Sequence, residues 1–244
     1  MGAWKRKRIV LIASTAALLV AFGIGLLLSP LSPFGPDTSL PDVRECGKLR
    51  FITQNNAHTF YPYGDEPVGF EYDLAAAFAE HIGVELEVTT LPWSQLIPAL
   101  RERRGDIVGA SLTVTEERAR RIAFSDGYMV VRQEVIVPAS NYSARDLTDL
   151  PGKTIHVRKG TSYEQRLREL QRGGLKINLV LRENVPTEEL IRQVAEGEID
   201  VTVADSNIAM LNRRYYPDVR IAFSISAPQL IAWAVHPDDE ELLA

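Results

Sequence analysis

The feature that most constrains this chain is a regular alternation of short apolar strand patterns with amphipathic helix patterns, from residue 49 to residue 215. The predicted strands are Leu49–Thr53, Val84–Leu91, Asp106–Ala110, Lys153–Val157, Ile177–Leu181 and Asp200–Ala204. The predicted helices are Tyr72–His81, Ser94–Arg104, Arg118–Ile122, Ser162–Gln171, Thr187–Glu196 and Ser206–Tyr215. Strands that alternate with helices indicate an α/β fold whose sheets are mostly parallel.

The alternation falls into two similar series, separated near Pro138. The phrase from Leu100 to Val108 resembles the phrase from Val194 to Val201, because each combines a helix end, a glycine and the acidic start of a strand. Two similar series predict two α/β lobes. Open α/β sheets bind ligands at the carboxyl ends of their strands, so two facing lobes would surround one cleft.

Composition excludes several functions for this 244-residue chain. The net charge is -5, although residues 5–8 are all basic and no acidic residue precedes Asp37. The chain after these basic residues is therefore more negatively charged than the whole. Such a chain is a poor nucleic-acid binder, because phosphate affinity depends on lysine and arginine. The single cysteine, Cys46, and four scattered histidines predict no internal disulfide and no zinc site. No cofactor is expected.

The N-terminus has the pattern of a membrane segment. Residues 9–28 carry no charge and, as a helix, would be about 30 Å long, the thickness of a bilayer core. The basic segment 1–8 then stays in the cytoplasm and the remainder is exported. We expect an uncleaved anchor, with a cleaved signal peptide as the alternative. The proline-containing segment 29–46 is predicted to be a linker.

The most informative polar phrase follows the predicted strand that ends at Ala110. It contains Ser111, Thr113 and Arg118, and Thr115 is a good helix N-cap. Arg118 lies near the positive end of that helix, where an anion should offset its charge. A surface acid such as Glu117 would suffice. The alternative is a ligand carboxylate that Arg118 binds with two hydrogen bonds, assisted by the Thr113 hydroxyl.

Two further positions have both a structural and a functional interpretation. Asp205 ends a predicted strand before a helix, so it is either an ordinary N-cap or a carboxylate that receives a ligand ammonium group. Thr161 and Glu164 have capping-box spacing, which is a sufficient structural reason for them. The same turn, with Ser162, also presents backbone N–H groups that could hold a carboxylate.

Aromatic residues and catalytic motifs complete the residue-level reading. Phe60 follows the first predicted strand and Trp93 follows the second, so each belongs either to a lobe core or to a pocket wall. The sequence contains no nucleophile elbow, phosphate-binding glycine loop or dinucleotide fingerprint. No catalytic residue is predicted in this chain.

Five phrases resemble the family 3 extracellular solute-binding proteins, the periplasmic receptors for polar amino acids. They are Val68–Leu74, Ile97–Leu100, Ser111–Arg118, Ile122–Tyr128 and Lys153–Gly160. The resemblance implies a two-lobed periplasmic-binding-protein-like fold of type II. It also implies an interlobe site for an amino acid or small peptide-like ligand.

The same resemblance assigns roles and boundaries. Thr113, Arg118 and the Thr161–Ser162 turn would hold the ligand carboxylate, Asp205 the amine, and Trp93 and Phe60 would form aromatic walls. Lobe 1 would comprise residues 47–134 plus 232–244, and lobe 2 residues 138–227. Gln133–Val137 and Pro228–Ile231 would cross between the lobes.

A second resemblance is to the N-terminal module of the membrane-bound lytic transglycosylase F family. It rests on the phrases Thr59–Tyr61, Glu66–Leu74, Ala204–Ser206, Tyr216–Asp218 and Gln229–Trp233. In that family such a module regulates a domain that cleaves peptidoglycan, which makes a muropeptide-like ligand possible. It implies that the catalytic domain is absent from this chain and that lobe 1 is truncated at Ala244. The implied location is the periplasmic face of the bacterial inner membrane, or the periplasm after cleavage.

Two alternatives remain open. The chain could be a free amino-acid-binding protein that delivers its ligand to a transporter permease. It could also be an enzyme on the same fold, because some relatives of these receptors are cyclohexadienyl dehydratases.

Overall fold

The computed structural model describes residues 40–64 and 66–243. The predicted basic and membrane segments, residues 1–28, lie outside this part, as do residues 29–39 of the predicted linker. Within the described ranges, no helix is both long and apolar enough to cross a bilayer.

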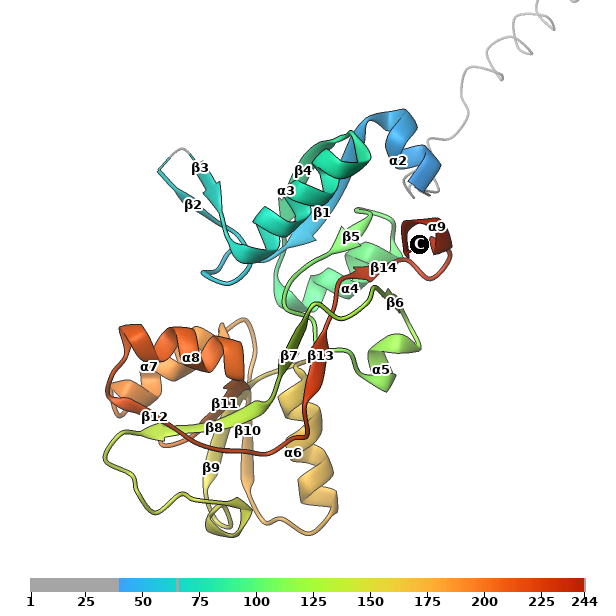
Figure 1. The fold of residues 1–244 in the computed structure, drawn as a ribbon. Helices are drawn as coiled ribbons and strands as arrows, with labels where there is room; N and C mark the ends of the chain where they lie inside the picture. The colour runs from blue at the N-terminus through green and yellow to red at the C-terminus, as the bar shows by residue number, and fades with distance from the viewer. Residues whose placement is uncertain (1–39, 65, 244) are drawn as a thin grey trace, which may run out of the picture. The chain divides into compact units, whose positions relative to one another are not determined.

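The described elements alternate along the chain much as the pattern predicts (Figure 1). The α-helices are α2 (Leu40–Cys46), α3 (Phe70–Ile82), α4 (Trp93–Arg101), α5 (Glu116–Ala119), α6 (Ser162–Arg172), α7 (Thr187–Ala195), α8 (Ser206–Tyr215) and α9 (Glu240–Leu243), with a 3-10 turn η1 (Leu147–Asp149). The first strands are β1 (Lys48–Thr53), β2 (Tyr61–Tyr63), β3 (Glu66–Val68), β4 (Glu85–Thr90), β5 (Ile107–Val108), β6 (Ala123–Phe124) and β7 (Met129–Val131). The later strands are β8 (Gln133–Pro138), β9 (Thr154–Arg158), β10 (Asn178–Arg182), β11 (Thr202–Asp205), β12 (Val219–Ser224), β13 (Gln229–Ile231) and β14 (Ala234–Val235).

The strands form two five-stranded sheets, and each sheet defines a lobe. Lobe 1 has the order β4-β1-β5-β14-β6, and lobe 2 has the order β10-β9-β11-β8-β12. In lobe 1, β1 is parallel to β4 and β5, whereas β14 is antiparallel to β5 and β6. In lobe 2, β9 is parallel to β10 and β11, whereas β8 is antiparallel to β11 and β12.

The prediction of mostly parallel sheets is therefore wrong for half of the pairings. Helical crossovers join the parallel strands, as the alternation indicates. The antiparallel strands β6, β8, β12 and β14 come from the two stretches in which the chain passes between the lobes. These stretches carry no helix pattern that would have revealed their direction.

Each sheet buries both faces, because alternate strand residues point to opposite sides. In β1, Leu49 and Phe51 pack with α3, whereas Ile52 packs with α4. In β8, Val135 packs with α6, and Ile136 packs with α7 and α8. Helices thus cover both faces of each sheet and leave the carboxyl ends of the strands available for a site.

The lobes are joined by two neighbouring chain segments. Strands β7 and β13 pair antiparallel and run between the two sheets (Figure 1). The prediction placed the first crossing at Gln133–Val137, but these residues form most of β8, inside the lobe 2 sheet. They are buried there and pair with two neighbours, so the apolar residues Val135–Val137 belong to a central strand.

The end of the predicted linker is also ordered structure. Leu40–Cys46 forms α2, and Val43 is buried in the lobe 1 core against Leu49. Prolines in residues 29–46 suggested an extended spacer, but one of them, Pro41, stands in the first turn of α2, where proline is tolerated. Cys46 is exposed and forms no disulfide.

Candidate functional site

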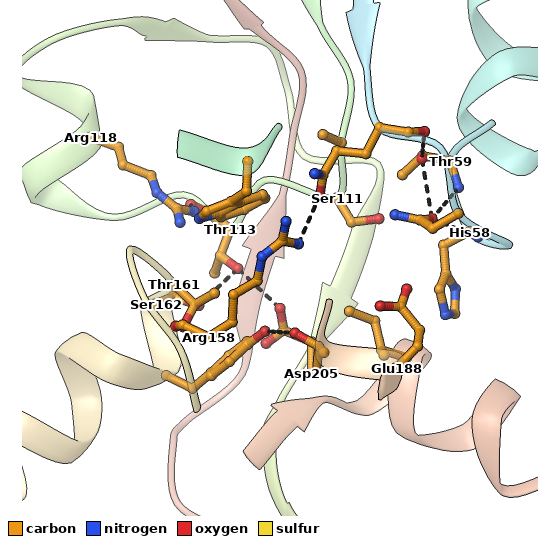
Figure 2. A pocket seen from close by; sticks show the side chains of 17 residues that line it. His58, Thr59, Ser111, Thr113, Arg118, Arg158, Thr161, Ser162, Glu188 and Asp205 are labelled. Atoms are coloured by element: carbon orange, nitrogen blue, oxygen red, sulfur yellow. Dashed lines mark hydrogen bonds between the residues drawn. The ribbon is translucent and has the colours of Figure 1, made fainter. Parts of the chain in front are cut away.

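The carboxyl ends of strands from both lobes meet at one cavity (Figure 2). Gln54 follows β1, Ser111 follows β5, Arg158 ends β9 and Asp205 ends β11. The cavity volume is about 30 Å³, so the lobes are in close contact around it. Seven of the eight predicted site residues line it, namely Trp93, Ser111, Thr113, Arg118, Thr161, Ser162 and Asp205.

Hydroxyl groups connect the lobes at the centre of the cavity. Thr113 Oγ1 of lobe 1 donates to Asp205 Oδ2 of lobe 2 at 3.3 Å. Ser162 Oγ of lobe 2 donates to Thr113 Oγ1 at 3.1 Å. These contacts bring together three residues that are far apart in the sequence.

Asp205 is a buried carboxylate with unused hydrogen-bonding capacity. Its side chain is 3% exposed, and Oδ1 has no hydrogen-bond partner among the described residues. The desolvation of this site raises the pKa of Asp205 to about 7, although the Arg118 charge and the Thr113 hydroxyl oppose the shift. Asp205 begins α8 but makes no side-chain capping bond, so the N-cap interpretation does not explain it.

Arg118 projects from α5 into the same cavity and is 8% exposed. Its Nη1 donates to the carbonyl of Thr113 at 2.8 Å, and its Nη2 donates across the lobes to the carbonyl of Gly160 at 3.2 Å. Burial lowers the pKa of Arg118, and Asp205 opposes this more than Glu117 does. Among the described residues Arg118 has no acid within 4.0 Å, so Glu117 is not its ion-pair partner.

The turn before α6 closes the cavity from lobe 2. Gly160 has a φ of 81°, and its carbonyl also accepts a hydrogen bond from Trp93 Nε1 at 3.1 Å. Thr161 Oγ1 caps the backbone N–H of Glu164 at 3.4 Å, as its spacing predicts. The indole of Trp93 therefore lies against the same turn that presents Ser162, consistent with a pocket wall.

A buried glutamate supports the Ser111 side of the cavity. Ser111 has a φ of 52°, and Glu71 Oε1 accepts a hydrogen bond from its backbone N–H at 2.7 Å. The Tyr128 hydroxyl donates to the same oxygen at 2.5 Å, and Trp233 Nε1 donates to Oε2 at 2.7 Å. Burial raises the pKa of Glu71, and these hydrogen bonds oppose the rise. Sequence reasoning assigned no role to Glu71.

Charged and polar groups that were not predicted also line the cavity. Arg118 is on one side of the view in Figure 2, and His58 and Glu188 are on the opposite side. Arg158 Nη1 donates to Gln54 Oε1 across the lobes at 3.0 Å. Burial raises the pKa of Glu188 and lowers that of His58 to about 4, so the imidazole is neutral.

The sequence indicated these residues of the cavity to different degrees. Arg158 directly follows a predicted strand, and its position at a carboxyl end could have identified it. Glu188 was read as a helix-dipole acid in the first turn of a helix. His58 Nε2 is buried without a partner among the described residues, and no sequence pattern indicated this.

Phe60 does not line the cavity. Its ring packs against Tyr72, with the ring centroids 5.7 Å apart. Among residues 40–64 and 66–243, no three His, Cys, Asp or Glu side chains gather as a metal site would require.

Comparison with known proteins gives a consistent result. The model of the bacterial extracellular solute-binding proteins, family 3, matches residues 49–173. A membrane-bound lytic murein transglycosylase F of Desulfosudis oleivorans is 51% identical over 204 residues, which cover 84% of this chain and 45% of that protein. The chain thus spans less than half the length of the curated relatives it matches.

Two solved structures have the same fold. The arginine-bound form of truncated ArgBP from T. maritima has a TM-score of 0.73 and 27% identity, and the match covers 83% of this chain and 94% of that one. An ancestral amino-acid-binding protein, described as a precursor of cyclohexadienyl dehydratase, has a TM-score of 0.72 and 28% identity. That match covers 84% of this chain and 88% of the other.

Proposed function

Because the chain belongs to the bacterial extracellular solute-binding proteins of family 3, we propose that it binds a small zwitterion between its lobes. The ligand is an amino acid or a peptide-like compound, including muropeptide-like molecules. The observation that carries the proposal is the convergence of Arg118 and Asp205, from opposite lobes, on one buried cavity.

The chemistry of the two ends follows from these groups. The Arg118 guanidinium and the Thr113 hydroxyl receive the ligand carboxylate, together with N–H groups of the Thr161–Ser162 turn. Asp205 receives the ammonium group through its unpartnered Oδ1. Each charge-assisted hydrogen bond contributes about 1.5–3 kcal/mol, so a few of them account for most of the roughly -8 kcal/mol of micromolar binding.

Ligand entry requires the lobes to separate. A cavity of about 30 Å³ holds water molecules but no amino acid. The bound ligand takes the place of the direct contacts of Thr113 with Asp205 and Ser162, and only closed lobes engage both of its ends.

Calorimetry of the full chain in a nonionic detergent, with a panel of amino acids and muropeptides, tests the proposal. We expect Arg118→Lys to lose most of the affinity, because lysine lacks the planar fork of donors. Arg120→Lys is the matched control, because Arg120 is an exposed arginine directly after the same helix and pairs with Glu116. Unchanged binding by Arg118→Lys would contradict the proposed role of Arg118 in holding the ligand carboxylate.

We further propose that the chain is the ligand-sensing part of a lytic transglycosylase, held at the periplasmic side of the membrane by residues 9–28. Relatives named membrane-bound lytic murein transglycosylase F support this proposal. We expect the gene to encode a lysozyme-like domain in frame after Ala244. We also expect cell fractionation to recover the full chain with the membranes. An immediate stop codon in intact genomic sequence would favour a free binding protein that serves a permease.

A catalytic alternative is motivated by the likeness to a dehydratase precursor. That precursor is itself named as an amino-acid-binding protein. Turnover of prephenate or arogenate is the assay, and we expect none.

A further inference from the structure

A second and larger cavity adjoins the first. Its volume is about 380 Å³, which lies within the usual range for small-molecule pockets. Trp93, Arg118 and Arg158 line both cavities, so only side chains separate them. We refer to the second cavity as the outer groove. Like the first, it is built from both lobes.

The outer groove is strongly basic. Arg118 and Arg121 reach it from lobe 1, and Arg158 and Lys159 reach it from lobe 2. Glu183 is the one acid among its lining residues, and it is paired with Lys159 at 2.5 Å. The chain as a whole has a net charge of -5, so this concentration of positive charge is local.

These cations lie close together across the lobe boundary. The guanidinium carbons of Arg118 and Arg158 are 5.3 Å and 5.2 Å from the centroid of the Trp93 ring. The two charges are therefore separated by about a Debye length at most, and they belong to opposite lobes. The Arg121 side chain has no hydrogen bond or ion pair with any described residue. Lobe closure thus brings cations of both lobes into one groove, and one of them, Arg121, has no acidic partner in the described part of the chain.

One wall of the outer groove is apolar. Trp93, Ile97 and Leu112 line it on the lobe 1 side. A ligand that fits must carry at least two negative charges and must tolerate an apolar surface. Carboxylates attached to a short hydrocarbon meet both conditions, because arginine binds carboxylates through two parallel hydrogen bonds.

We propose that the outer groove binds a small dicarboxylate that bridges the lobes and favours their closure. The bound anion offsets the mutual repulsion of the cations that line the groove, Arg118 and Arg121 from lobe 1 and Arg158 from lobe 2. Once a cleft ligand has replaced the direct contacts of Thr113, only closed lobes engage both of its ends, so an anion that bridges the lobes favours the same occupied form and each ligand raises the affinity for the other. This second effect rests on the proposed amino-acid site, whereas anion binding itself does not.

The test uses the full chain in a nonionic detergent, with succinate as the probe and KCl holding the ionic strength constant. We expect succinate to raise the melting temperature, and to raise the affinity for the best amino acid of the panel about fivefold or more. In the double variant Arg121→Gln, Lys159→Gln both effects disappear. Without succinate the variant binds the amino acid more tightly than the wild type, because the repulsion has been removed.

A matched control removes two exposed cations elsewhere in lobe 2, through Lys153→Gln and Arg213→Gln, and keeps the succinate response. Inorganic phosphate carries a similar charge without a hydrocarbon body. If phosphate acted as strongly as succinate, the assignment to a dicarboxylate would be wrong. An identical succinate response in the wild type and in the Arg121/Lys159 variant would overturn the site altogether.

The two proposals fail separately. If amino-acid binding depended on Arg118 but did not respond to succinate, the proposal for the interlobe amino-acid site would stand and the proposal for the outer groove would be wrong. If succinate stabilised the wild type but not the variant, and no amino acid of the panel bound, the proposal for the outer groove would stand and the proposal for the interlobe amino-acid site would be wrong.

Discussion

At the residue scale, we expect Asp205 to make the proposed ligand binding sensitive to pH. Its pKa is raised to about 7 in the free protein, and only the ionised form receives an ammonium group. Below pH 7 a proton therefore competes with the ligand. We expect an affinity about tenfold weaker at pH 6 than at pH 8, measured by calorimetry. His58 has a pKa of about 4 and stays neutral in this window.

Asp205→Asn provides the control for this effect. The variant should bind weakly at every pH, with a flat profile between pH 6 and pH 8. A wild-type affinity that is constant over this interval would contradict the role assigned to the carboxylate.

Folding without ligand should respond to the same group with the opposite sign. The folded-state pKa of Asp205 is above its unfolded value of about 3.8, so the unfolded chain ionises first as the pH rises. The stabilising contribution is fully present below about pH 4 and is lost as the pH approaches 7. We expect Asp205→Asn to gain a few kcal/mol of unfolding free energy relative to the wild type between pH 4 and pH 7, measured by urea denaturation.

Glu188 should select the ligand side chain. It lies in the cavity at the end opposite Arg118, and it has no ion pair within 4.0 Å among the described residues. A cationic ligand side chain would pair with it. We expect Glu188→Gln to weaken binding of lysine or arginine about tenfold by calorimetry and to leave binding of leucine unchanged. Glu189→Gln is the control, because Glu189 pairs with Arg192 instead. Equal losses for all three amino acids would contradict this selection.

At the scale of elements, Glu71 connects α3 to the Ser111 turn and to the crossing strands. It accepts hydrogen bonds from Ser111, Tyr128 and Trp233 in a fully buried position. Glutamine has one acceptor oxygen and would turn an N–H group toward one of these donors. We expect Glu71→Gln to lose about 1–3 kcal/mol of unfolding free energy, measured by urea denaturation.

Two companion variants define what this loss means. Tyr128→Phe removes a single donor and should lose about 1 kcal/mol. Glu80→Gln lies on the exposed side of the same helix and should change little. If all three variants were as stable as the wild type, the Glu71 hydrogen bonds would contribute nothing to the free energy of unfolding.

The elements differ in how well the sequence predicts them. Helices such as α6 and strands such as β1 follow from periodicity, because their amphipathic or buried patterns depend on near neighbours. The antiparallel strands and the β7–β13 crossing depend on pairings between segments far apart in the sequence, about 100 residues for β7 and β13. Seven predicted site residues reach the cavity because they stand at strand ends or helix starts. Glu188 and His58 do so through tertiary packing, which no local pattern encodes.

At the scale of the whole molecule, the lobes must separate before a ligand can enter. Thr113 Oγ1 and Ser162 Oγ are 3.1 Å apart across the lobes, so we expect paired cysteines at these positions to form a disulfide. We expect Thr113→Cys with Ser162→Cys, in a Cys46→Ser background, to bind no amino acid when oxidised and to recover binding when reduced. Calorimetry with and without dithiothreitol measures this.

Single-cysteine variants treated in the same way should not respond to the reductant. Undiminished binding by the oxidised double variant would mean that the ligand reaches its site without lobe separation. If the reduced double variant bound too weakly to measure, the radius of gyration of its oxidised and reduced forms without ligand, from X-ray scattering, would report the same restriction, because only the reduced lobes can separate.

The pairing of β7 with β13 has a consequence for protein engineering. The chain enters and leaves lobe 2 at adjacent points, and the lobe 2 sheet, from β8 to β12, comes from one uninterrupted stretch. Lobe 2 is therefore a cassette that can be exchanged between relatives with two cuts and no change in connectivity. If the proposed roles hold, a chimera that keeps Arg118 but imports a foreign counterpart of Glu188 is expected to change the preference for the ligand side chain and to keep the binding of the ligand carboxylate.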